Sequence, residues 1–341
     1  MSENTKIEWC DHSWSPWRGC TKVSPGCANC YAETLSKRNP AVLGQWGRGK
    51  PRVLAKNWND PVRWDKRSLQ AWDAERGKGL PFSYPRRPTV FPSLCDWLDE
   101  EVPVEWLARF LQLIHETPNL TWLLLTKRPE NWYKRISLVS DQCCPHDSDF
   151  EDWVQEWIDC VDMPERGSPP QNVWVGASAE NQEWADKRIS ALLKIPTVGR
   201  FLSVEPMLGP VDLEKVTQEV APGFFGDCLQ WYHRGRGQDS IPFPTVDWVI
   251  FGGESGPGAR PCNVDWIRSG VKQCKAAGVS PFVKQLGKHA VGSGRCRDCA
   301  DDGPICPNSG LPCGGLKHPK GGDMAEWPED LRVREFPEGL R

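Results

Sequence analysis

The sequence predicts an α/β protein built on a parallel (β/α) barrel, complete or partial. Short, nearly continuous apolar runs recur along the chain, amphipathic helical patterns lie between several of them, and polar or charged residues follow each run. Nearly continuous apolar strands are typical of a parallel sheet that is covered on both faces. Strands that alternate with helices indicate parallel βα units. An open doubly wound sheet is the alternative architecture.

Seven apolar runs are expected to form the strands of this sheet. They are residues 6–9, 89–91, 122–125, 173–176, 201–204, 246–251 and 282–283. Apolar residues at helical spacing predict helices between them, over residues 104–116, 182–193 and 265–277. One domain over residues 1–341 is therefore expected.

Three stretches interrupt the alternation and are interpreted as insertions. Residues 137–170 are acidic, residues 214–244 follow no clear pattern, and residues 288–320 are rich in Gly, Pro and Cys. The apolar runs are far shorter than the roughly 20 residues that cross a bilayer, so no membrane association is expected. The first residues lack the apolar stretch of a signal peptide, which predicts a cytoplasmic location.

The chain has a net charge of -3, but its charge is unevenly distributed. Residues 37–87 hold thirteen basic and four acidic side chains, whereas residues 141–165 hold nine acids and neither Lys nor Arg. Aromatic residues are interleaved with the basic ones, namely Trp46, Trp58, Trp64, Trp72 and Tyr84. This combination favours a surface that faces nucleic acid. A solvated basic face without a ligand is the alternative.

Fifteen cysteines in a reducing compartment indicate metal ligation or catalysis rather than disulfides. Cys20, Cys27 and Cys30 lie within eleven residues, and the turn at Pro25 and Gly26 folds the first thiol back towards the others. Three thiolates can bind three irons of a four-iron cluster and leave the fourth iron open. A structural zinc loop, or a cluster with Cys10 as fourth ligand, are the alternatives.

The cysteine loop has the spacing C-x6-C-x2-C, and four further segments accompany it: TKRP at 126–129, SVEP at 203–206, GGESG at 252–256 and GGD at 321–323. Together these segments resemble the phage-associated three-cysteine-motif family of uncharacterised proteins, which is grouped with the radical SAM superfamily. The resemblance covers nearly the whole chain outside the insertions. If the chain is encoded by a phage, its location would be the host cytoplasm.

The resemblance implies that Cys20, Cys27 and Cys30 hold a [4Fe–4S] cluster whose open iron binds S-adenosylmethionine (SAM). A radical SAM-type enzyme generates a 5′-deoxyadenosyl radical, which would modify an unactivated carbon, and it takes its electron from a donor protein. Two features depart from the usual loop of the superfamily. The first spacing is three residues longer than the usual C-x3-C-x2-C, and Asn29 stands where an aromatic residue usually precedes the last cysteine.

Polar residues that follow the predicted strands are expected at the mouth of the barrel, where active sites of this fold lie. We predict catalytic roles for Lys127, Glu205 and Glu254. Glycines allow a ligand to approach the backbone closely. The predicted cofactor-binding residues are Ser203, Glu205, Gly252, Gly253, Glu254 and Ser255. A tight turn with a solvated Glu254, and a salt-bridged rim without chemistry, are the alternatives.

A second set of cysteines has the spacing C-x2-C-x6-C-x6-C in the last insertion and consists of Cys296, Cys299, Cys306 and Cys313. A segment with so little apolar content needs a metal to order it. These cysteines are expected to bind zinc or, failing that, an auxiliary iron–sulfur cluster. Cysteines in a loop that bind no metal are the alternative.

Two function hypotheses follow. In the first, a radical enzyme acts on a nucleotide or on a modified base in DNA. In the second, the chain is a non-catalytic nucleic-acid-binding protein that zinc or a cluster stabilises.

Overall fold

A seven-stranded parallel sheet organises the computed structural model, which describes residues 2–76, 86–143, 148–221, 224–229, 231–232, 245–292, 309–312 and 315–340. The strands follow one another in chain order across the sheet. They are β1 (His12–Ser13), β4 (Thr89–Phe91), β5 (Thr121–Thr126), β6 (Val173–Ser178), β7 (Gly199–Val204), β11 (Trp248–Gly252) and β13 (Ser280–Gln285). Every pairing between neighbours is parallel.

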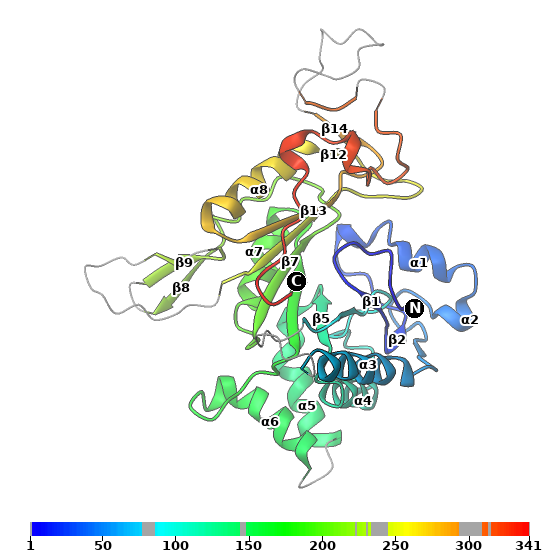
Figure 1. Ribbon diagram of the computed structural model, residues 1–341, viewed down its shortest axis with the longest axis vertical. Helices are drawn as coiled ribbons and strands as arrows, with labels where there is room; N and C mark the ends of the chain where they lie inside the picture. The colour runs from blue at the N-terminus through cyan, green and yellow to red at the C-terminus, as the bar shows by residue number, and fades with distance from the viewer. Residues whose placement is uncertain are drawn as a thin grey trace.

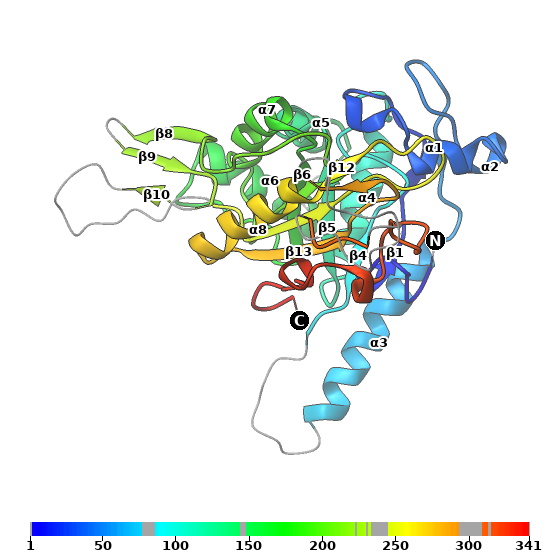
Figure 2. The same cartoon turned by 90° about the horizontal axis from the view of Figure 1, so that it is seen from above.

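The sheet curls into a half-barrel, with β1 at one edge and β13 at the other (Figures 1 and 2). Among the described residues these edge strands do not pair with each other, so the barrel is partial. Six of the seven predicted strands are confirmed within a few residues. They were recognisable because each is a nearly continuous apolar run.

The first predicted strand, at residues 6–9, is wrong. These residues form a turn, and the strand begins at His12 instead. The Asp11 carboxylate accepts a hydrogen bond of 2.7 Å from the backbone N–H of Thr89 and thereby joins β1 to β4. Trp9 is buried and packs against the aromatic rings of Phe91, Phe201 and Trp248. Trp9 therefore packs inside the half-barrel and does not occupy a position in a strand.

Side chains alternate between the two faces of each strand. One set forms a small inner cluster within the curl, built from Trp9, Leu123, Phe201, Trp248, Ile250, Phe282 and Leu340. The other set belongs to the main hydrophobic core under the helices, for example Trp122, Leu124 and Val249. The half-barrel thus has an apolar floor inside and a helical layer outside.

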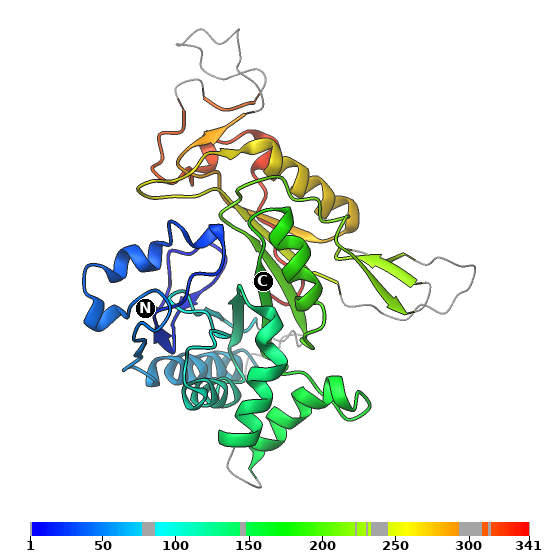
Figure 3. The same ribbon diagram turned by 180° about the vertical axis from the view of Figure 1, so that it is seen from behind.

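The outer layer consists of five helices, several of which Figure 3 shows in front of the sheet. They are α4 (Val104–His115), α5 (Trp132–Cys143), α6 (Asp149–Asp162), α7 (Gln182–Leu192) and α8 (Val264–Ala277). The three predicted helices are confirmed as α4, α7 and α8. Asn181 and Asn263 begin the last two by accepting hydrogen bonds from backbone N–H groups of the first turn.

The predicted insertions differ from one another in structure. In residues 137–170, α6 buries Val154 and Trp157 in the main core, so this stretch adds a packed helix. In residues 214–244, β8 (Thr217–Ala221), β9 (Phe224–Asp227) and β10 (Trp231–Tyr232) form a separate antiparallel sheet that projects from the body (Figure 1). Within 288–320, the described part includes β14 (Ala290–Val291), which pairs with β12 (Cys262–Asn263).

The N-terminal segment supplies β2 (Trp17–Arg18), β3 (Val53–Leu54), α1 (Tyr31–Ser36), α2 (Pro40–Leu43), α3 (Asn59–Arg76) and the short 3-10 helix η1 (Pro25–Cys27). Three further 3-10 helices are η2 (Pro129–Asn131), η3 (Met324–Glu326) and η4 (Glu329–Leu331). None of the described helices combines the length and hydrophobicity of a membrane crossing.

Candidate functional site

The loop that carries Cys20, Cys27 and Cys30 is attached to the ends of three sheet strands. Arg128, which follows β5, donates to the Thr21 carbonyl and places Nη1 3.8 Å from Cys20 Sγ. Glu180, which follows β6, accepts a hydrogen bond of 3.2 Å from the backbone N–H of Gly26. Glu254, which follows β11, accepts one of 3.0 Å from Asn29 Nδ2. The loop therefore lies at the carboxyl edge of the half-barrel.

Glu254 makes more contacts than a solvated turn residue would. Its side chain is only 6% exposed and receives two hydrogen bonds from the Arg260 guanidinium, at 2.7 and 2.9 Å, besides that from Asn29. Arg260 also donates to the Pro25 carbonyl at 3.0 Å. Burial alone would raise the pKa of Glu254, but the hydrogen bonds from Arg260 and Asn29 outweigh it and lower the pKa. The carboxylate thus stays charged and holds the loop.

Arg128 and Glu180 are themselves held by buried ion pairs. Arg128 pairs with Asp96 at 2.7 Å, and Glu180 pairs with Arg188 at 2.7 Å. Burial favours the neutral form of Glu180, but the charges of Lys127 and Arg188 overcome that effect and lower its pKa. Because Arg128 and Glu180 are each held by a buried partner of opposite charge, their contacts to the loop have a fixed geometry.

The thiols themselves are partly shielded from solvent. Burial raises the pKa of Cys20 to about 12, Asp96 adds to the shift, and Arg128 opposes it. Burial also raises the pKa of Cys30, while Lys127 acts in the other direction. Both groups are therefore protonated at neutral pH without a metal. Since the thiolate is the metal ligand, metal binding here must release protons.

A polar group of side chains lines the mouth above the apolar floor. Lys127 Nζ donates to Ser178 Oγ at 2.8 Å, and Lys284 Nζ contacts both carboxylate oxygens of Glu205 at 2.7 and 3.0 Å. Glu205 and Lys284 are 19% and 21% exposed, so their ion pair is accessible from the mouth. Strand alternation explains the arrangement, because Phe201 of the floor and Glu205 are four residues apart and face the same side.

The structure gives specific places to the remaining predicted residues at the mouth. A Cβ atom at Gly253 would lie 2.2 Å from the Leu286 carbonyl oxygen, so glycine is required there by close backbone packing. A Cβ atom at Gly252 would lie 3.2 Å from the Glu205 carboxyl carbon, which leaves that carboxylate room. Ser203, two positions before Glu205, is buried, and Ser255 is half-buried.

Cys10 precedes β1 and is half-buried. It packs against the inner apolar cluster, and burial raises its pKa well above the usual range. Among the described residues, no three His, Cys, Asp or Glu side chains converge closely enough to hold a single metal ion. Ligands of a four-iron cluster bind different irons and stand farther apart, so this finding concerns a mononuclear site.

The second cysteine set, Cys296, Cys299, Cys306 and Cys313, lies outside the described residues. Its predicted metal site stays a prediction.

Sequence reasoning missed two residues that shape this site. Arg260 fastens both Glu254 and the loop, and the Tyr31 hydroxyl, next to Cys30, donates to the Ser93 carbonyl at 2.7 Å. The only local signal for Arg260 was that it is a cation six residues after Glu254 in the same glycine-rich loop. No local pattern points to the Tyr31 contact, because 62 positions separate its partners.

The fold and site together define a class of protein: an open α/β half-barrel with a three-cysteine loop fastened to its carboxyl edge. Residues 4–308 match the model of a family described as "Protein of unknown function (DUF5131)", and the chain belongs to that family. No curated protein and no solved structure matches the chain significantly.

Proposed function

We propose that the chain is a radical SAM-type iron–sulfur enzyme in which Cys20, Cys27 and Cys30 hold a [4Fe–4S] cluster. One observation carries this proposal: side chains from the ends of three strands fasten the cysteine loop to the carboxyl edge of the half-barrel. A loop that served only to fold the N-terminal segment would not need anchors from β5, β6 and β11. Such anchors are typical of a group that must be held in a set position.

The donor set fits an iron–sulfur cluster. The carboxylates around the loop are all paired: Asp96, Glu180 and Glu254 each with an arginine, and Glu33 with Lys22. The three thiols are therefore the free metal donors of the loop, and soft thiolates suit iron–sulfur clusters. When bound, the reduced cluster and SAM would supply a 5′-deoxyadenosyl radical.

The other residues of the site would bind, orient and exclude water. The Glu205–Lys284 pair offers a carboxylate and an ammonium group at the mouth, and we assign Glu205 to the amino group or ribose of SAM. Lys127, between Ser178 and the cysteine loop, suits a carboxylate of the cofactor or a phosphate of the substrate. The apolar floor below them excludes water from the reacting atoms. Glu254 acts as a positioning residue through Asn29.

We propose a nucleotide or a base in DNA as the substrate, and a protein electron donor as the partner. The excess of basic residues in 37–87 supports this choice. Trp64 takes no part in it, because it is buried and stacks on His12 at 4.5 Å. Tyr84 lies outside the described residues.

Anaerobic reconstitution tests the cluster. We expect about four irons per chain at this loop and loss of that iron when Cys20, Cys27 or Cys30 is replaced by Ala. Cys274→Ser is the matched control, because Cys274 is a buried cysteine of α8 and does not belong to the loop. Cys10→Ser should also keep the cluster. A colourless protein that binds zinc through these three cysteines would contradict the proposal and favour a zinc-stabilised nucleic-acid-binding protein.

A further inference from the structure

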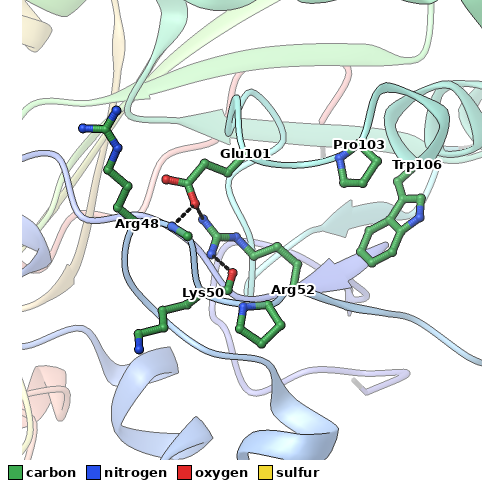
Figure 4. Close-up of a pocket in the computed structure, with 8 residues that line it drawn as sticks. Arg48, Lys50, Arg52, Glu101, Pro103 and Trp106 are labelled. Carbon is green, nitrogen blue, oxygen red and sulfur yellow. Dashed lines mark hydrogen bonds and ion pairs between the residues drawn. The ribbon is translucent and has the colours of Figure 1, made fainter.

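Two cavities on the outside of the half-barrel are each lined by one side chain of α4. The first has a volume of about 550 Å³ and is lined by Arg48, Gly49, Lys50, Pro51, Arg52, Glu101, Pro103 and Trp106 (Figure 4). The second, of about 540 Å³, is lined by Lys56, Asn57, Trp58, Asn59, Asp60, Arg63 and Arg109. Trp106 and Arg109 are three residues apart and so share one face of α4. We call the two cavities together the α4 groove.

The α4 groove is strongly basic. Six basic and two acidic side chains line it, a net charge of +4. Both acids are engaged: Glu101 with Arg52 at 3.3 Å, and Asp60 with Arg63. The exposed cations Arg48, Lys50 and Lys56 have no carboxylate partner within the part of the chain that the structure describes. Unpaired cations gathered in a cavity attract an anion.

The groove also has a rigid frame. Arg52 is almost fully buried and donates to the carbonyls of Gly47 and Lys50, which sets the shape of the loop that carries Arg48 and Lys50. Figure 4 shows these two side chains on one side of the Arg52 guanidinium and Trp106 on the other. Pro103 precedes α4, and no side chain caps this helix, so its positive end adds to the field.

Aromatic side chains in the groove suit a ligand that carries flat rings as well as negative charge. Trp106 is half-buried and lines the first cavity, where it offers a ring to a flat partner. Trp58 is already covered by the Arg109 guanidinium, whose centre lies 4.1 Å from the ring centroid. Arg109 is therefore a fixed cation, and Trp106 supplies the aromatic ring that lines the first cavity. Cations that track phosphates and an aromatic ring that stacks a base are the features of single-strand binding.

The groove adjoins the cysteine loop directly. The backbone N–H of Gly47 donates to the Cys20 carbonyl at 2.9 Å, and Arg52 Nη2 donates to Thr21 Oγ1 at 2.5 Å. A strand lying in the groove would thus pass beside the loop that we assign to the cluster. We propose that the α4 groove binds the phosphate backbone of a single-stranded nucleic acid and stacks one base on Trp106. This names the substrate class of the proposed function and rests on that function for the reaction, although binding itself needs no cluster.

Binding of a short fluorescent DNA single strand to the full chain tests the proposal. Arg48→Glu with Lys50→Glu should weaken binding at least about tenfold at low salt and flatten the slope of log K against log salt by about 1.4. Lys272→Glu with Lys275→Glu is the matched control, because both lysines are exposed on α8 and the charge change is the same. Equal effects of the two pairs, or no effect of the first, would overturn the proposal.

Trp106 separates stacking from charge. Trp106→Ala should weaken binding about tenfold, whereas Trp106→Phe should keep it within about twofold because the ring is retained. The Phe variant also guards against misfolding, since Trp106 packs against the main core. An acidic polypeptide that displaced the strand equally well, or a duplex that bound as tightly, would overturn the single-strand assignment.

Two further comparisons complete the test. Single-stranded RNA also carries phosphates and flat bases, so the tighter binding of either DNA or RNA identifies which nucleic acid the groove prefers. Measurement before and after cluster reconstitution separates this inference from the proposed function. If the chain binds the strand but forms no cluster on reconstitution, the proposed enzyme function fails and the assignment of the groove stands. If it forms the cluster but does not bind the strand, the assignment of the groove fails and the proposed function stands.

Discussion

Asn29 donates a hydrogen bond of 3.0 Å to Glu254, although 225 positions separate the two residues. The same side-chain amide donates to the Gly258 carbonyl at 2.8 Å. Asn29 directly precedes Cys30, so it ties the last thiol of the loop to the end of β11. This contact gives a physical reason for a polar amide directly before Cys30.

Replacing Asn29 tests the importance of this tie. In Asn29→Ala we expect the protein to lose about 1 kcal/mol of stability, because Glu254 loses one of its hydrogen bonds. The alkylation of Cys27 and Cys30 should become faster, and iron should be retained less well after reconstitution. Asn57→Ala is the control, since Asn57 is exposed and distant in sequence from the loop. Unchanged thiol reactivity and iron retention would show that the tie is dispensable.

Gly26 provides a second test of how the loop is held. A Cβ atom there would lie 2.8 Å from Glu180 Oε1, and Glu180 is fully buried and cannot retreat easily. Gly26→Ala should therefore destabilise the protein by about 1–3 kcal/mol, as judged by the urea midpoint. At Gly209 the nearest atom to such a Cβ is 3.5 Å away, so Gly209→Ala should have little effect. Equal midpoints for the two variants would contradict the close approach.

Asp11 should make the attachment of β1 sensitive to acid. Burial would raise its pKa, but hydrogen bonds from Arg86 and Thr89 and the charge of Arg86 outweigh burial and lower it. A carboxylate with a lowered folded-state pKa stabilises the protein above its unfolded pKa, near 3.8, and this contribution is lost as pH falls through the folded value.

The wild type should consequently lose stability more steeply below about pH 4 than Asp11→Asn does. At neutral pH the variant should be about 1–2 kcal/mol less stable. Chemical unfolding at several pH values measures both quantities. Parallel pH profiles for the two proteins would contradict the assignment.

The second cysteine set should bind its own metal. Replacing Cys296, Cys299, Cys306 and Cys313 together by Ala should remove zinc or a second cluster and leave the iron of the first loop in place. Metal analysis by mass spectrometry measures both. Unchanged total metal would show that this segment holds none.

The strands of the half-barrel were predictable because burial on both faces demands apolar residues in unbroken runs, as in β5 and β11. The prediction of a strand at residues 6–9 was wrong because Trp9 does not belong to a strand. It packs inside the half-barrel against Phe201 and Trp248. An isolated aromatic residue carries no periodicity that separates these two uses.

The positions of the mouth residues followed from strand ends, but their pairing did not. The sequence placed Lys127, Glu205 and Glu254 at the mouth, but Lys284 joins Glu205 there from within β13, across the intervening strand β11. It contained no sign that Arg260 would reach both Glu254 and Pro25, because such contacts depend on how a loop folds in three dimensions. The α4 groove was visible only as basic composition, since Trp106 and Arg109 lie outside the basic stretch.

The most direct measurement of the central claim is the formation of 5′-deoxyadenosine by the anaerobically reconstituted protein with SAM and a strong reductant. We predict that SAM changes the EPR spectrum of the reduced cluster and that 5′-deoxyadenosine accumulates. Glu205→Ala should weaken SAM binding without loss of iron, and Cys30→Ala should abolish both signals. A wild-type cluster that carries about four irons yet leaves its EPR spectrum unchanged by SAM and forms no 5′-deoxyadenosine would contradict the radical mechanism.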